Sequence, residues 1–197
     1  MGGHMKQLLF SLLFVWCSSL HAGQFMQPDN LFPKVKLITS HGEVVVELDR
    51  SRAPLTVNNF LSYVKRNAYN NTVFHRLIPG FVLQGGGYTP EYKAIETLNP
   101  IFNESGNGLK NQIGSIAMAR QTDPHSADSQ FYFNLNDNTS LDPGSRWGYA
   151  VFGQVISGME VLEKIQQQET AVSDTLGWPD VPVEPILLKM VILLPQD

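Results

Sequence analysis

One short stretch of the chain combines residue types that could act on a polar substrate without forming a covalent bond. It spans residues 74–87, where an arginine, a glutamine and two phenylalanines stand among apolar residues, and three glycines close the stretch. A guanidinium offers several N–H donors in a rigid fork and stays charged. Aromatic side chains beside it could hold an apolar group of the substrate.

Two short strands must position these side chains. If residues 73–77 and 81–84 are extended, alternation places Arg76 on the opposite face from His75 and puts Val82 and Gln84 on one face together. Pro79-Gly80 then forms the turn between the strands. A second stretch, residues 114–120 followed by 129–133, has a similar mixture of small, aromatic and polar residues.

Together these motifs resemble the cyclophilin family of peptidyl-prolyl cis-trans isomerases. Phe-His-Arg is followed by Phe and Gln-Gly-Gly, and then in order by Met-Ala-Arg, Ser-Gln-Phe and Val-Phe-Gly. The resemblance covers roughly residues 35–195 and is greatest to the short bacterial periplasmic members. It implies a mainly β fold, a closed eight-stranded antiparallel barrel capped by two α-helices, with the active groove on the outer surface.

The reaction that this resemblance implies is rotation about an X-Pro peptide bond, with a barrier of about 18–20 kcal/mol. At the twisted transition state the proline nitrogen regains a lone pair, so a fixed donor beside it favours the twisted form. An apolar slot must hold the proline ring while the acyl side turns. The site needs no nucleophile, and we expect neither a metal nor a cofactor.

The resemblance implies a role for ten residues. The catalytic ones are Arg76, as the donor, and Gln84. The residues implied to bind substrate are Phe81, Val82, Ala119, Arg120, Gln130, Tyr132, Leu141 and Tyr149. Gln84 and Gln130 would hold the arginine and the substrate backbone, while the backbone at Ala119 and Arg120 would pair with an extended substrate. Taken alone, Arg76 could instead form a surface salt bridge, and the aromatic residues could belong to the core.

The sequence departs from the best-known family members at four positions. Val82 replaces the usual Met, Tyr132 replaces Phe, and Tyr149 replaces His. Ser140 stands where cyclosporin-sensitive members have a tryptophan, so we expect weak cyclosporin binding. The Tyr132 hydroxyl brings a polar atom near the proline slot, which leaves substrate preference open.

Other polar residues receive structural interpretations. We expect His75 to be a core histidine whose ring is satisfied by backbone hydrogen bonds, because isomerisation needs no proton transfer. His41 and His125 have no partner at metal-ligand spacing. We interpret three acidic residues as turn residues: Asp123, Asp128 and Asp137. The glycines at 85–87 would allow close backbone approach or a bend at the barrel rim.

The remaining elements follow from periodicity. Residues 35–39 and 43–48 form a hairpin, with Val44, Val46 and Leu48 on one face. A helix begins at Pro54, buries residues at positions 57, 60, 61 and 64, and stops near Asn67. The expected strands then cover residues 113–119, 129–135, 149–155 and 186–194. A long loop spans 88–112, and a capping box from Ser157 to residue 160 opens a second helix.

Composition fits one globular domain: the chain has 197 residues, of which 43% are hydrophobic, and a net charge of -4 that disfavours nucleic-acid binding. Residues 1–22 read as a signal peptide, and Cys17, the only cysteine, lies within it. Residues 1–4 resemble a cloning remnant before Met5. Residues 23–33 then form an arm, which we expect to be flexible, and 34–197 the isomerase domain.

Two functions are compatible with this sequence. The leading one is an exported isomerase that accelerates the folding of proline-containing unfolded or exported proteins. It would be periplasmic or, in a source without a second membrane, secreted. The alternative is a non-catalytic cyclophilin-like chaperone or binding module for Pro-containing segments. We expect a monomer that binds no nucleic acid and, after signal cleavage, no membrane.

Overall fold

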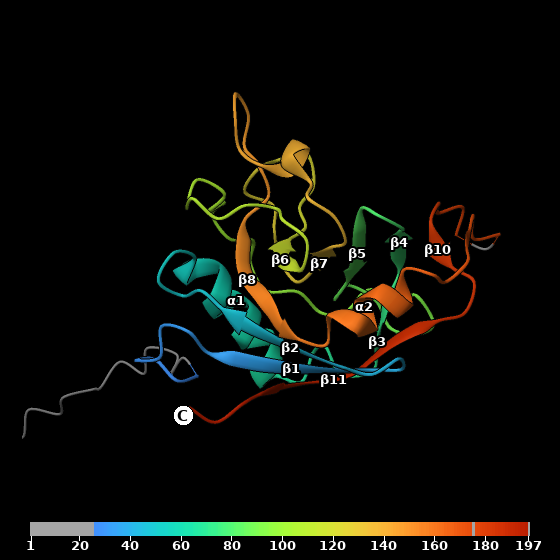
Figure 1. Ribbon diagram of the computed structural model, residues 1–197, viewed down its shortest axis with the longest axis horizontal. Helices are drawn as coiled ribbons and strands as arrows, with labels where there is room; N and C mark the ends of the chain where they lie inside the picture. Colours follow the sequence, from blue (N-terminus) through green and yellow to red (C-terminus); the bar gives the residue numbers. More distant parts are fainter. Residues whose placement is uncertain (1–25, 175, 197) are drawn as a thin grey trace, which may run out of the picture.

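The strands of this computed structural model form a sheet that curls into a nearly closed antiparallel barrel (Figure 1). The structure describes residues 26–174 and 176–196, so the expected signal peptide, with Cys17, and the remnant at residues 1–4 lie outside the described residues. The barrel sheet has the order β3-β11-β1-β2-β8-β6-β7-β5-β4, and β9 and β10 form a separate pair. The strands are β1 (Lys34–Thr39), β2 (Glu43–Leu48), β3 (Thr72–Phe74), β4 (Arg76–Ile78), β5 (Val82–Gly85), β6 (Ser115–Met118), β7 (Phe131–Asn134), β8 (Val151–Ser157), β9 (Thr170–Ala171), β10 (Val181–Pro182) and β11 (Ile186–Leu193).

A bend at His75 closes the barrel. The strands β3 and β4 stand at the two ends of the sheet order, although His75 alone separates them in the chain. β3 pairs with β11 and β4 pairs with β5, so one bent segment joins both edges. If β3 and β4 are counted as one strand, the nine strands become the expected eight. The prediction of one continuous strand over residues 73–77 missed this bend.

The barrel interior is a continuous apolar core. In β2, Val44, Val46 and Leu48 are fully buried and face it, as their period of two predicted. In the β4–β5 hairpin, Leu77 and Leu83 point the same way and are also fully buried. The intervening residues of each strand therefore face outward, where a site can form.

Two α-helices cover the core. α1 (Pro54–Lys65) starts with the expected proline and buries its predicted stripe, with Phe60 packed against three core rings at centroid distances of 5.1–5.4 Å. It ends just before Asn67, whose φ of 56° stops the helix as expected. α2 (Met159–Ile165) buries Leu162 and Ile165. No described helix is long and apolar enough to cross a membrane.

The predicted capping box of α2 is wrong. Ser157 is the last residue of β8, where it pairs with Val45, and the N-cap of α2 is Gly158, with no side-chain cap. Gly158 has a left-handed φ of 90°, and a Cβ there would lie 2.3 Å from the carbonyl oxygen of Glu43. The tight passage from β8 into α2 therefore requires glycine and leaves Ser157 in the strand.

Two irregular segments contribute to the outer face. The loop between β5 and β6 has no regular element, as expected, and is pinned by isolated bridges such as Ile101 to Ala127. The segment after α2 contains the short β9–β10 pair, which the sequence analysis missed. A 3-10 helix, η1 (Thr139–Leu141), follows β7.

Residues 26–33, expected to be a flexible arm, are tied to the domain. Arg50 is buried, and its guanidinium donates hydrogen bonds to the backbone carbonyls of Met26, Gln27 and Asn30. These contacts hold the described part of the arm beside the barrel.

His75 is buried at the bend, as expected, but one of its ring nitrogens lacks a partner. The imidazole packs against Tyr88 and Trp178 with centroids 4.8 and 6.2 Å away, and its Nδ1 has no hydrogen bond in the described structure. The expectation of a fully satisfied ring is therefore wrong, because aromatic rings surround it. Burial, and secondarily the charge of Arg76, lower the pKa of His75 from 6.5 to about 4.

This pKa predicts a pH-dependent stability. Between pH 6.5 and about 4, His75 is protonated in the unfolded chain but remains neutral in the folded chain. Acidification over this range therefore favours unfolding. We expect the wild type to lose about 2 kcal/mol more unfolding free energy than His75→Leu between about pH 7.5 and about pH 5. Denaturant unfolding of both proteins at each pH measures this. Equal losses of unfolding free energy in the two proteins would contradict the lowered pKa of His75.

Candidate active site

The β4–β5 hairpin places Arg76 directly opposite Gln84. Their Cα positions are paired in the antiparallel register, as are those of Ile78 and Val82. Because Leu77 and Leu83 point into the core, these four residues lie on the outer face of the barrel. The turn between the strands uses Gly80 at a φ of 68°, as Pro79-Gly80 predicted.

A second apolar cluster, separate from the barrel core, lies on this side of the sheet. We call it the outer cluster. Its buried members are Val82, Ala117, Tyr132 and Val151, and the partly buried residues packed around them are Phe81, Leu109, Ala119, Leu141 and Tyr149. Six of the predicted substrate-binding residues therefore come together here. Leu109, Ala117 and Val151 were missed, because from sequence they are indistinguishable from core residues.

Arg76 forms an ion pair with Asp180. The Nε of Arg76 lies 3.4 Å from Oδ2 of Asp180, and the two side chains are 37% and 36% exposed. The carbonyl oxygen of Asp180 also accepts a hydrogen bond of 2.9 Å from the Leu77 N–H, which fixes the segment that carries the carboxylate. In the described structure Asp180 is the only partner of the Arg76 side chain, so the terminal guanidinium nitrogens are free. The salt bridge that the sequence left open for Arg76 is therefore present, and its partner Asp180 was not predicted.

The two glutamines of the predicted site bind each other. Nε2 of Gln84 donates to Oε1 of Gln130 at 2.9 Å. A Cβ at Gly87 would lie 2.7 Å from Cγ of Gln130, so this glycine provides the room that the Gln130 side chain needs. The predicted close approach of backbone is found at Gly86, where a Cβ would lie 3.0 Å from the carbonyl oxygen of Ser129. The expectation that Gln84 holds the arginine is wrong for this structure, in which Arg76 pairs with Asp180 instead.

The Tyr132 hydroxyl is turned into a buried polar network. It donates to Oδ1 of Asn111 at 2.8 Å, and the same oxygen accepts a hydrogen bond from Nδ2 of Asn134. Asn134 in turn contacts Ser115 and Asn138. Burial, followed by nearby Tyr149 and Asp142, raises the pKa of Tyr132 well above its usual value of 10. The polar atom expected near the proline slot is thus already satisfied.

The stretch after β6 offers unpaired backbone groups. The N–H of Ala119 donates to the carbonyl of Gln130 at 2.9 Å and is therefore occupied. In the described structure neither the N–H nor the carbonyl of Arg120 has a hydrogen-bond partner. The expected pairing with an extended substrate chain is therefore available at Arg120, while the Ala119 N–H is excluded.

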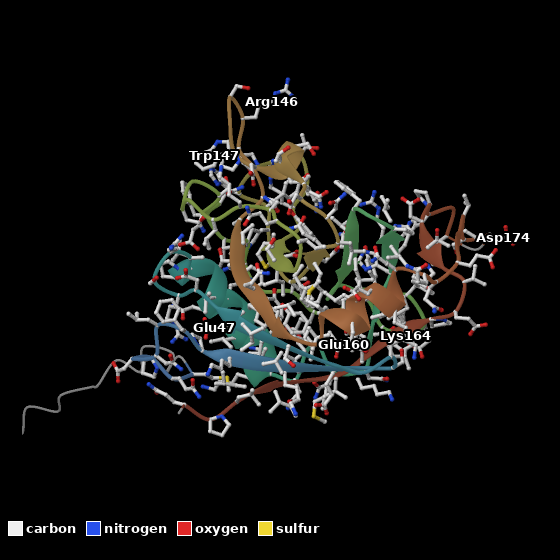
Figure 2. All side chains as sticks on the ribbon, viewed as in Figure 1. Glu47, Arg146, Trp147, Glu160, Lys164 and Asp174 are labelled. Carbon is white, nitrogen blue, oxygen red and sulfur yellow. The ribbon has the colours of Figure 1, made fainter. Side chains whose placement is uncertain are left out.

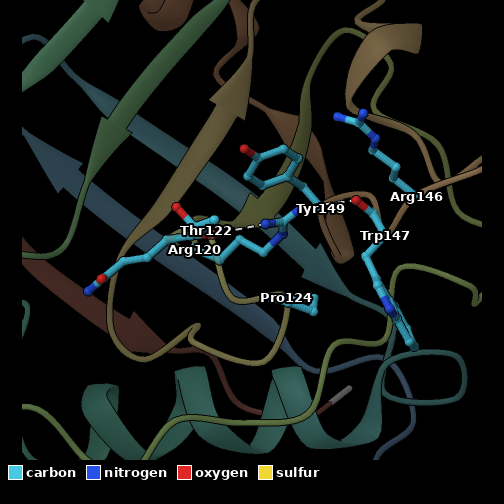
Figure 3. Close-up of a pocket in the computed structure, with 7 residues that line it drawn as sticks. Arg120, Thr122, Pro124, Arg146, Trp147 and Tyr149 are labelled. Carbon is cyan, nitrogen blue, oxygen red and sulfur yellow. Dashed lines mark hydrogen bonds between the residues drawn. The ribbon is translucent and has the colours of Figure 1, made fainter.

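The Arg120 side chain fastens two loops together (Figure 3). Its guanidinium carbon lies 4.6 Å from the ring centroid of Tyr149. Its nitrogens donate to the carbonyls of Gln121, Trp147 and Gly148 at 2.9, 2.9 and 3.3 Å. The Tyr149 ring contacts Tyr132 edge-on at a centroid distance of 5.8 Å, so it belongs to the outer cluster and to the loop fastened by Arg120.

Most of the other candidates have the structural roles expected for them. His41 contacts the neighbouring Ser40 hydroxyl, and Nδ1 of His125 accepts a hydrogen bond from the Asn103 N–H. Asp123 and Asp128 each accept a hydrogen bond from a backbone N–H one or two residues further on, as expected of turn residues. Asp137 instead accepts the N–H of Ile113, 24 residues away, so it ties two segments together rather than forming a turn. Among the described residues there is no group of three or more side chains able to hold a metal ion.

Comparison with known proteins identifies the family. Residues 34–190 match the family model described as cyclophilin type peptidyl-prolyl cis-trans isomerase/CLD. A peptidyl-prolyl cis-trans isomerase from Streptomyces antibioticus is 46% identical, over 81% of this chain and 98% of its own. Peptidyl-prolyl cis-trans isomerase B from Escherichia coli is 45% identical, over 78% of this chain and 94% of its own.

Solved structures agree with these relatives. A cyclophilin from Cryptosporidium parvum, crystallised in the presence of the dipeptide Ala-Pro, matches with a TM-score of 0.68 and 26% identity, covering 83% of this chain and 99% of its own. A cyclophilin from Hirschia baltica has a TM-score of 0.66 at 20% identity, a likeness in fold. The barrel with its two helices, the family model and the bacterial relatives give one result: this chain belongs to the cyclophilin-type peptidyl-prolyl cis-trans isomerases.

Proposed function

We propose that this isomerase binds a substrate proline ring on the outer cluster and directs the guanidinium of Arg76 at the proline nitrogen. The observation that carries this proposal is the hairpin register, which sets Arg76 and Val82 on one outward face. The Nε of Arg76 is held by Asp180, and its terminal nitrogens remain available to donate. A donor oriented before the substrate arrives stabilises the twisted amide without further reorganisation.

The substrate backbone would run along Arg120. The unpaired N–H and carbonyl there can form ladder hydrogen bonds with an extended peptide. Gln130, held by Gln84, would contact the same chain from β7. No bond is broken in this reaction, so these residues position the peptide while the amide rotates.

We also propose that the clients are exported proteins. The support is the sequence of residues 1–22, in which a basic Lys6 precedes an apolar run and a small-residue cleavage site. Residues 26–33 are held against the domain by Arg50, so cleavage after Ala22 would leave the described contacts intact. A periplasm would be the destination in a cell with two membranes, and the medium otherwise.

Removing the guanidinium tests the proposed donor. We expect Arg76→Ala to lower kcat/KM for an X-Pro peptide by about 10²–10³, equivalent to about 2.7–4 kcal/mol, because the twisted nitrogen loses its donor. The cis-to-trans relaxation of the peptide measures the rate. The control Arg66→Ala removes an exposed arginine at the end of α1. If the kcat/KM of Arg76→Ala is within about threefold of the wild-type value, Arg76 is excluded as the donor.

Asp180 provides a graded version of this experiment. Asp180→Asn removes the charge but keeps the backbone bond to Leu77, and asparagine tolerates the φ of 60° at this position. We expect kcat to fall about fivefold with KM little changed, since Arg76 loses its orientation. The matched control is Asp174→Asn on the same segment, which should keep the wild-type rate.

If Arg76→Ala is inactive as an isomerase yet still prevents the aggregation of an unfolded protein, the protein also has a separate chaperone role.

The hydroxyl of Tyr132 should matter for stability and little for catalysis. Tyr132→Phe deletes its hydrogen bond to Asn111, whose Oδ1 keeps its bond from Asn134. We expect a loss of about 1 kcal/mol in unfolding free energy and a kcat/KM within about threefold of the wild type. Denaturant unfolding and the peptide assay measure these. A tenfold fall in rate would instead mean that the hydroxyl contacts the substrate.

Cyclosporin should bind weakly, because the exposed Ser140 in η1 offers little contact area. We expect inhibition only above about 1 µM for the wild type and at least about tenfold tighter inhibition of Ser140→Trp. Thr139→Trp, which adds the same ring at the exposed neighbouring position, is the control. Sub-micromolar inhibition of the wild type would contradict this expectation.

A further inference from the structure

A large cavity lies beside the outer cluster, between the loop after β6 and the loop before β8 (Figure 3). Its volume is about 570 Å³, enough for one or two amino-acid side chains. The residues that line it are Arg120, Gln121, Thr122, Pro124, Arg146, Trp147 and Tyr149. Tyr149 also packs in the outer cluster, so the cavity and the proposed proline slot share a wall.

The charge of this cavity is positive. Of the described residues that line it, two are arginines and none carries a carboxylate. Two acidic residues of these loops do not line the cavity: the Asp123 carboxylate accepts the His125 N–H, and the Asp142 carboxylate lies 3.6 Å from Lys110. This local charge is opposite in sign to the net charge of -4 of the whole chain. An anionic group would therefore be attracted to this place.

The two arginines differ in how they are held. Arg120 uses three of its five N–H donors on backbone carbonyls, which fixes its fork and leaves two donors. The Arg146 guanidinium has no hydrogen bond or ion pair within the described part of the chain. Figure 2 shows Arg146 at the tip of a projecting loop, with Trp147 below it, and both well away from Lys164 on α2. The cavity thus pairs one preorganised cation with one unpartnered cation.

The apolar wall of the cavity is also braced. The Trp147 ring lies 5.0 Å from His125 and 5.7 Å from Phe102 by centroid distance, and His125 stacks on Phe102 at 4.3 Å. Such packing keeps the indole in place beside Pro124. A carboxylate on a short aliphatic stem matches a site with an apolar wall and two guanidinium donors.

We propose that this cavity is a specificity subsite for an Asp or Glu side chain within two residues of the substrate proline. The spacing follows from the shared wall: Tyr149 lies against Tyr132 of the outer cluster, and each residue of an extended chain advances about 3.3 Å. This subsite rests on the proposed function, because the proline must occupy the outer cluster. It selects acidic segments among the clients, a preference that the isomerisation chemistry itself does not require.

A peptide series tests the subsite. Each of the two positions before and after proline is occupied in turn by Glu or by the isosteric Gln, and kcat/KM is measured by cis-to-trans relaxation at low salt. At one position we expect a Glu-to-Gln ratio of at least about fivefold, which weakens at about 0.5 M salt. Arg146→Gln should bring this ratio near one, and Arg146→Glu should favour a Lys peptide instead. Arg66→Gln, with the same change in net charge, should keep the wild-type ratio.

The outcomes separate this proposal from the proposed function. If the wild type accelerates the Gln peptides but no position shows a ratio above about twofold, the subsite is excluded and the isomerase site stands. A ratio that persists in Arg146→Gln also overturns the proposal, because the preference would then arise elsewhere. If the folded wild type accelerates none of the peptides, the proposed function itself fails.

Discussion

The bend at His75, followed by the inward–outward alternation of β4, is the constraint on which the rest of the structure depends. The bend lets β3 and β4 pair with opposite edges of the sheet, which closes the barrel. Beyond the bend, Leu77 must point inward, so Arg76 must point outward. Closure of the fold and presentation of the guanidinium are therefore two results of one backbone geometry.

The outer face obtains its order from loops that carry few regular hydrogen bonds. Asn111 comes from the long loop before β6, yet it joins Tyr132 and Asn134 in a buried network beneath the outer cluster. Asp180 comes from the segment after α2 and reaches Arg76. Each loop thus brings one polar residue to the sheet, and a satisfied buried network holds its members in one arrangement.

Much of this structure could be predicted from the sequence, because the signals were periodic or local. The alternation in β2, the stripe of α1 and the turn at Pro79-Gly80 were all correct, and the family motifs found six of the nine members of the outer cluster. The Ser157 cap failed because a steric requirement at Gly158, set by the distant Glu43 carbonyl, overrides local capping preference. Asp180 could not be found, since its pairing with Arg76 spans more than one hundred residues and has no local signature.

The order of the strands also constrains when the barrel can form. β11, the last strand of the chain, lies between β1 and β3, two of the first. Until residues 186–193 have emerged from the ribosome, β1 and β3 lack their shared neighbour and the sheet remains open. Closure of the barrel must therefore wait for residues 186–193 and for contacts of long sequence separation, which form slowly. If the chain follows the exported route proposed above, this delay would keep it unfolded, and able to pass through a translocation channel, until β11 has been made.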